Sequence, residues 1–307
     1  MKMKQITLAI ALIGATTLAQ AAIVTEWGFS TSATFSNAVF GGNGTGGAQT
    51  VSPSILEWGA ATGDFAAGDT GNASNNQSAL TIGNGETGVT RYNGAAATGT
   101  VDTIVSGVPA FGTPGTVGLG ITFTHFNNPL DGNFRTLTSG TVVDTLTLTP
   151  LNPPGSDTSA PEITFNFQFR ETPNAGSGNP ATCAGGTPVP TAGCGDLFGF
   201  AGIPNLDLPF TYDGQQYFAS VLVLGPNFSN SPIAFLNDGQ CSALGFNTGT
   251  SGERCQGFLT AENAATTVRF GFSISTERQF TVPEPGVMAL LGLGLVGLGF
   301  SRRSRKA

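Results

Sequence analysis

The strongest constraint on the fold is a run of strictly alternating apolar and polar side chains over residues 162–170. Successive side chains of a β-strand point to opposite faces, so this period of two predicts a strand with one buried and one solvated face. Its buried face carries Ile163, Phe165, Phe167 and Phe169. The chain must therefore cover a row of aromatic side chains with another layer of structure.

Other segments predict further strands. Residues 267–275, 141–149 and 119–123 also alternate, and residues 217–224 are apolar on both faces, as expected of a central strand. No convincing amphipathic helix interrupts this pattern. Turn chemistry separates the segments, at Asn152-Pro153-Pro154-Gly155, Tyr212-Asp213-Gly214 and Asn237-Asp238-Gly239.

The segments Gly41–Gly47 and Ala66–Gly88 contain few large apolar residues, and we expect them to be long loops. Many strands joined by such turns and loops predict an all-β fold, namely an antiparallel β-sandwich or a jelly-roll-like domain. With both ends of the chain set aside, residues 22–281 form the predicted domain.

The first 21 residues have the layout of a secretory signal peptide. Lys2 and Lys4 precede an apolar run, 6–19, and Ala19-Gln20-Ala21 provides small residues at a cleavage site. We expect signal peptidase to cut before Ala22. The alternative is a short buried helix, which the charges and the cleavage site do not favour.

The other end combines an apolar stretch, 286–300, with a basic cluster, and we expect 286–300 to form a short membrane helix. It is shorter than the about 20 residues of a full membrane span, and basic residues favour the cytoplasmic side. The alternative is a core helix with a frayed end, which the several glycines disfavour. The basic residues are Arg302, Arg303, Arg305 and Lys306.

Immediately before this stretch lie Val282, Pro283, Glu284 and Pro285. The order of Pro-Glu-Pro, apolar run and basic end resembles the PEP-CTERM sorting signal of Gram-negative bacteria. The resemblance implies a sorting tail at 282–307, recognition by an exosortase-type membrane peptidase, transient docking at the inner membrane, and a final place at the cell surface or outside the cell.

The net charge of the predicted domain limits the classes of partner that it can bind. Residues 22–281 carry 18 acidic side chains and six arginines, a formal charge of −12. Such a surface repels phosphate backbones, so nucleic acid is not expected as a partner. An acidic, polar surface suits a soluble extracellular protein, and extracellular polysaccharide is the partner class we consider.

Four cysteines occur as two local pairs, Cys183 with Cys194 and Cys241 with Cys255. Export exposes them to oxidising conditions, which favour disulfides. Three pairings exist, and we expect the two local ones because each encloses a polar or Gly/Pro-rich loop. A zinc site would need closer spacing and more histidine than this chain has.

No catalytic residue is predicted. The single histidine, His125, continues the phase of 119–123, and we expect it at a strand end with its ring bonded to nearby loop backbone rather than acting as a base. A Gly-x-Ser-x-Gly elbow is absent. The turns Asp131-Gly132-Asn133 and Asn237-Asp238-Gly239 offer oxygens for calcium, but such residues also make ordinary turns. No other metal or cofactor is expected.

A second resemblance extends through most of the chain. Thr124, His125 and Asn127 match the Thr-His-x-Asn motif of one PEP-CTERM subfamily, and so do three later segments, 171–174, 183–198 and 257–262. This resemblance implies one domain but no reaction. Pro173 ends a strand and Asn174 suits a turn, so a structural role explains the first of these segments as well as a binding site would.

We therefore expect an exported, non-enzymatic surface or matrix protein. The alternative is a carbohydrate-binding or adhesive module, and a secreted hydrolase comes third. For the module, aromatic rings are the candidates for stacking on sugars: Trp27, Trp58, Tyr92, Tyr212 and Tyr217.

Overall fold

The computed structural model confirms the all-β fold. The predicted signal peptide, 1–21, and the predicted sorting tail, 282–307, lie outside the described residues. Those described are 22–42, 44–62, 76–83, 96–105, 115–172, 188–189, 193–200, 207–225, 231–246 and 255–279.

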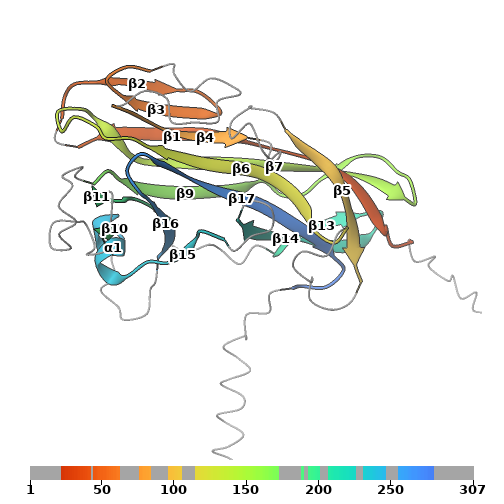
Figure 1. The fold of residues 1–307 in the computed structure, drawn as a ribbon. Coiled ribbons are helices and arrows are strands. Elements are labelled where there is room, and N and C mark those ends of the chain that lie inside the picture. Colours follow the sequence, from red (N-terminus) through yellow and green to blue (C-terminus); the bar gives the residue numbers. More distant parts are fainter. Residues whose placement is uncertain are drawn as a thin grey trace, which may run out of the picture.

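The described elements are seventeen strands and one short helix, and Figure 1 shows the long strands running through the molecule. In chain order they are β1 (Glu26–Gly41), β2 (Ala48–Val51), β3 (Ile55–Gly59), β4 (Gln77–Gly83), β5 (Ala97–Ile104), β6 (Gly118–Asn127), β7 (Thr136–Asn152), β8 (Thr158–Ser159), β9 (Ile163–Arg170), β10 (Pro188–Val189), β11 (Gly193–Cys194), β12 (Asp196–Phe200), β13 (Asp207–Tyr212), β14 (Gln215–Leu224), β15 (Ala234–Phe235), α1 (Asp238–Ala243), β16 (Gln256–Thr260) and β17 (Ala264–Ser275).

The strands form two halves that meet at β5. One half has the order β15-β16-β12-β9-β7-β1-β5, and the other runs from β13 and β14 through β17 to β6, β4, β3 and β2. β5 pairs antiparallel with β1 and, over two residues, parallel with β17, so it joins the halves. β10 and β11 make a separate small pair.

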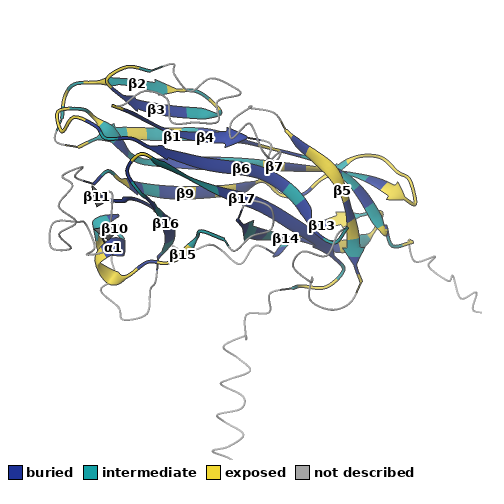
Figure 2. Ribbon diagram, viewed as in Figure 1, coloured by how far each residue is buried: buried dark blue, intermediate teal, exposed yellow. Residues whose placement is uncertain are grey.

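Phenylalanine rings fill the space between the two halves. Phe123 on β6 lies 4.8 Å, between ring centroids, from Phe198 on β12, and Phe165 on β9 lies 5.5 Å from Phe270 on β17. Each of these contacts crosses from one half to the other, as in a β-sandwich. Figure 2 shows the long strands largely buried, with exposed residues at tips and edges.

The alternating segments are confirmed as strands. Residues 162–170 form β9 with the predicted burial, and 217–224 lie within β14, which has a partner on each side. The predicted turn at Tyr212-Asp213-Gly214 closes the β13–β14 hairpin, where Asp213 and Gly214 have φ of +48° and +78°. These positive values are typical of two-residue hairpin turns.

Two local predictions are wrong. The segment Ala66–Gly88 contains β4, which is buried throughout because it pairs with both β3 and β6. Asn237-Asp238-Gly239 is the start of α1 rather than a hairpin turn, and the Asn237 side chain accepts a 2.8 Å hydrogen bond from the backbone N–H of Gln240. Asparagine favours both contexts, so composition alone did not separate them.

The packing predicts a strong contrast between two Phe→Ala substitutions. Phe198 is 1% exposed and lies 4.9 Å, between ring centroids, from both Phe167 and Phe258. Phe198→Ala should lower the free energy of unfolding by about 3–5 kcal/mol. Phe235→Ala is the matched control because Phe235 is 61% exposed, and it should change stability by about 0.5 kcal/mol or less. Urea denaturation measures both, and similar losses would contradict this core.

Candidate functional site

Two strands of one half end their core-facing rows in acidic residues. On β9 the row of phenylalanines ends at Phe169, and Glu171 is the next residue in the same phase. On β12 the first residue, Asp196, has the same phase as Phe198. Leu197 pairs with Arg170, so Asp196 and Glu171 are the next opposing positions.

Two more core-facing rows end in polar residues. On β6 the row that contains Phe123 continues with His125 and Asn127, all of them buried. Beyond β16 the row that contains Phe258 reaches Glu262, in the turn before β17. β6 belongs to the half opposite β9, β12 and β16, so both halves contribute to the group.

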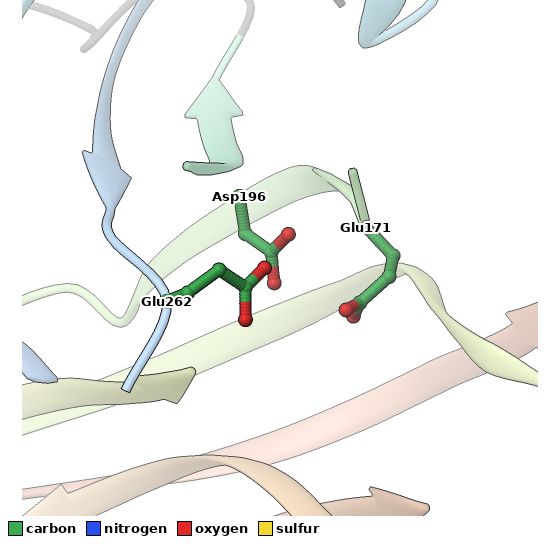
Figure 3. A group of neighbouring side chains, drawn as sticks. All are labelled: Glu171, Asp196 and Glu262. Carbon is green, nitrogen blue, oxygen red and sulfur yellow. The ribbon is translucent and has the colours of Figure 1, made fainter. Parts of the chain in front are cut away.

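The result is a compact polar cluster inside the sandwich, formed by His125, Glu171, Asp196 and Glu262. One carboxylate oxygen from each of the three acids lies within 4.8 Å of the others, and Figure 3 shows the carboxylates converging from three segments. His125 Nε2 is 3.8 Å from Asp196 Oδ2, and both side chains are fully buried. Trp58 stacks on the imidazole at 6.1 Å between ring centroids, 11° from parallel.

Asp196 and Glu171 each have one carboxylate oxygen that accepts a hydrogen bond from a neighbouring donor. The backbone N–H of Thr172 donates to Asp196 Oδ1 at 2.8 Å, and the Thr172 hydroxyl lies 3.3 Å from the same oxygen. Trp58 Nε1 donates to Glu171 Oε2 at 3.3 Å. Asn127 Nδ2 donates to the Thr260 carbonyl at 2.8 Å, which fixes the amide beside the cluster.

The remaining polar atoms of the cluster are buried and make no hydrogen bond of regular geometry in the described structure, although Glu171 and Asp196, and likewise Glu262 and Asn127, lie close enough for their side chains to interact. They are both ring nitrogens of His125, Asn127 Oδ1, Glu171 Oε1, Asp196 Oδ2, and both carboxylate oxygens of Glu262. A buried polar atom without a partner costs about 1–3 kcal/mol. This number of unpartnered polar atoms in one place indicates a binding site for a group outside the chain, such as water or an ion.

Burial shifts the pKa values of the whole cluster toward neutral forms. It raises the pKa of Glu171 to about 8 and that of Glu262 to about 7. Burial, and then the charge of Glu171, raise the pKa of Asp196 well above its ordinary value. Burial lowers the pKa of His125 to about 3. Without a counter-charge the cluster therefore retains protons near neutral pH.

A groove of about 640 Å³ lies beside the cluster and has one cluster residue, Glu171, in its lining. Its lining includes Glu171, Thr172, Phe169, Asp131 and Leu130. Chemically, oxygen atoms gathered at such a place either share protons or bind a cation. Among the described residues, Glu171, Asp196 and Glu262 are the one group of three side chains with metal-binding geometry.

The structure brings the predicted motif residues together but changes their roles. The expectation that His125 ends a strand and bonds to loop backbone is wrong: β6 continues to Asn127, and neither ring nitrogen has a partner in the described structure. Thr124 points away from the cluster, and its hydroxyl lies 3.0 Å from that of Thr267. β9 does end where predicted, at Arg170, and the next residue, Glu171, belongs to the cluster.

The two predicted calcium turns have ordinary structural roles. Asp131 Oδ1 accepts a 2.9 Å hydrogen bond from the backbone N–H of Asn133, and Asn237 begins α1. These contacts are what turn residues and helix caps make without an ion.

The predicted disulfide between Cys241 and Cys255 is present, with a Cα–Cα distance of 5.7 Å. Cys194 is also disulfide-bonded, and its predicted partner, Cys183, lies outside the described residues. The Cys241–Cys255 bridge ties α1 to the start of β16, among apolar side chains that include Leu197 and Leu244. The bridge therefore packs against Leu197, on the face of β12 opposite to Asp196.

Sequence reasoning did not assign Glu171, Asp196 and Glu262 to a site. Each continues the alternating phase of a phenylalanine row, and that phase is visible in the sequence. The sequence therefore indicates that these three acids face the core. Which ends meet depends on the pairing of strands far apart in the chain, which the phase does not give.

Comparison with models of protein families matches residues 281–306 to the PEP-CTERM protein-sorting motif. This match confirms the resemblance of the tail, and it includes Val282 to Pro285 and the basic cluster. It marks the chain as an exported protein that an exosortase, a membrane peptidase, sorts. The Thr-His-x-Asn subfamily stays a prediction. No curated protein matches the chain.

In the described part of the chain, no helix has the length and apolar character needed to cross a membrane. The predicted membrane helix, 286–300, lies outside that part.

The raised pKa of Glu171 predicts a pH-dependent stability. Between pH 4.5 and about 8 the folded chain holds a proton that the unfolded chain has released, so stability falls as pH rises through this window. In EDTA, raising the pH from 5 to 8 should therefore lower the melting temperature of both chains. The fall should be smaller for Glu171→Gln than for wild type, by roughly 3 °C or more. The neighbouring Asp196, Glu262 and His125 are common to both chains.

Glu162→Gln is the matched control because Glu162 is exposed at the start of the same strand segment. Its melting temperature should follow the wild-type pH profile. Parallel profiles for Glu171→Gln and wild type would contradict the burial of an ionisable group at this position.

Proposed function

We propose that the chain is a non-enzymatic protein of the cell surface or the extracellular polymer layer, anchored only transiently by its tail. The observation that carries this proposal is the sorting motif at 281–306. This motif lies C-terminal to a β-sandwich whose predicted acidic surface favours solubility outside the cell. Signal peptidase would release Ala22 as the first residue, and the exosortase would cut near Pro283–Pro285.

The position of His125 supports a role without catalysis. Its side chain is fully buried, and the pKa near 3 keeps the ring neutral. A general base must reach a proton of the substrate within hydrogen-bond distance. A fully buried histidine between two sheet layers has no such access, which disfavours a hydrolase that depends on it.

The alternative of a sugar-binding module loses most of its proposed stacking rings. Trp27, Trp58 and Tyr217 are fully buried, and Tyr212 packs at the edge of Trp27 with its ring centroid 5.5 Å away. Tyr92 lies outside the described residues. Contact with extracellular polysaccharide would therefore involve polar surface, such as the groove beside Glu171, rather than stacking on these rings.

Mass spectrometry of the protein from cells with and without the exosortase tests this proposal. In wild-type cells the mature chain should begin at Ala22 and end near Pro283, in the surface or extracellular fraction. In exosortase-deficient cells it should keep Arg302–Lys306 and sediment with membranes. Glu284→Gln should shift wild-type cells toward the second pattern.

Glu277→Gln is the control, because Glu277 lies upstream of the matched residues. It should be processed like wild type. The same C-terminus in both strains would contradict processing by the exosortase, and a chain that starts at Met1 would contradict export by the predicted route.

A further inference from the structure

We infer that His125, Glu171, Asp196 and Glu262 bind a divalent cation of the Ca²⁺ or Mn²⁺ class inside the sandwich. This site lies beyond the proposed function and depends on neither sorting nor processing. The inference stands on two observations. Three carboxylates converge within 4.8 Å, and beside one of them, Asp196, lies the fully buried imidazole of His125, 3.8 Å away and without a hydrogen-bond partner in the described structure.

Electrostatics gives the first reason. Three buried carboxylates within 4.8 Å repel one another when ionised, and water no longer screens them. Among the described residues, the ion-pair contact of these three acids is that of Asp196 with His125, and no arginine or lysine lies within 4.0 Å of them. A bound cation is the counter-charge that satisfies such a group.

The atoms without partners give the second reason. Glu171 and Asp196 each have one oxygen held by a donor and a second oxygen without one in the described structure. This is the arrangement of metal-binding carboxylates, whose outer oxygens are fixed by neighbouring donors. Both carboxylate oxygens of Glu262 have no hydrogen bond of regular geometry in the described structure, and the same holds for the amide oxygen of Asn127.

The position of His125 fits a shared ion better than a direct hydrogen bond. A separation of 3.8 Å between Nε2 and Asp196 Oδ2 is too long for a hydrogen bond. Ligand atoms about 2.0–2.6 Å from one metal lie roughly 3–5 Å from each other. The stacked Trp58 and the edge of Phe169, at 5.0 Å between ring centroids, fix the imidazole plane.

The donor set selects the class of ion. Carboxylate and amide oxygens favour Mg²⁺, Ca²⁺ and Mn²⁺, whereas imidazole and thiolate favour zinc and copper. Three carboxylates and one imidazole therefore fit Ca²⁺ or Mn²⁺, and the imidazole favours Mn²⁺ of the two. Of the four side chains, Glu171 is partly buried and lines the groove of about 640 Å³.

Binding would join the two halves of the sandwich at this end. His125 lies on β6 in one half, while Glu171 and Asp196 belong to β9 and β12 in the other. Binding only to the folded chain stabilises it. The expected consequence is a melting temperature that depends on the concentration of the ion.

Calorimetric titration of the untagged full chain, after EDTA treatment, tests the inference with MnCl₂, CaCl₂, ZnCl₂ and MgCl₂ in separate arms. Mn²⁺ or Ca²⁺ should bind at one ion per chain and raise the melting temperature by roughly 5 °C or more at 100-fold excess over Kd. Glu262→Gln, which keeps the side-chain shape, should weaken binding at least about tenfold. Asp238→Asn, in the first turn of α1, should bind like wild type.

Electron spin-echo modulation of the Mn²⁺-loaded chain provides a readout that depends on one residue. Coordinated imidazole gives nitrogen modulation, and His125 is the single histidine of the chain. The signal should be present in wild type and absent in His125→Gln. No binding of any of the four ions, binding that Glu262→Gln leaves unchanged, or Mn²⁺ bound without nitrogen modulation would each overturn the site as assigned.

Discussion

The two halves of the sandwich face each other across a core from which water is excluded, and every residue in a core-facing row must accept that environment. Phenylalanine does so readily, as at Phe123, Phe167 and Phe198. The rows do not stop where the phenylalanines end. His125 and Glu171 occupy the next positions of the same phase, so the geometry that buries rings also buries ionisable groups.

This continuation links the fold to the candidate site. Burying a charge is costly unless the charge is paired, so a chain that folds this way needs either protonated acids or a counter-ion. Protons make the cluster sensitive to pH, and a cation would make it a cross-link between sheet layers. Either outcome acts on the stability of a protein that has to persist outside the cell, where the sorting motif directs it.

The sequence allowed good prediction where structure is local. Alternation identified β9, and the turn residues Asp213 and Gly214 placed the β13–β14 hairpin. It did not reveal β4, whose burial comes from strands on both sides of it, or the cluster. Glu171 and Asp196 meet because β9 and β12 pair in one register, and His125 meets them because β6 lies across the core. Those facts are non-local, so neither composition nor phase contains them.

Anomalous X-ray diffraction from crystals of the untagged chain grown with MnCl₂ tests the cation site most directly, because it locates the ion. We expect one strong manganese peak within about 2.5 Å of His125 Nε2 and of carboxylate oxygens from Glu171, Asp196 and Glu262. A cluster without a manganese peak, with its carboxyl groups bonded to one another or to water, would contradict it.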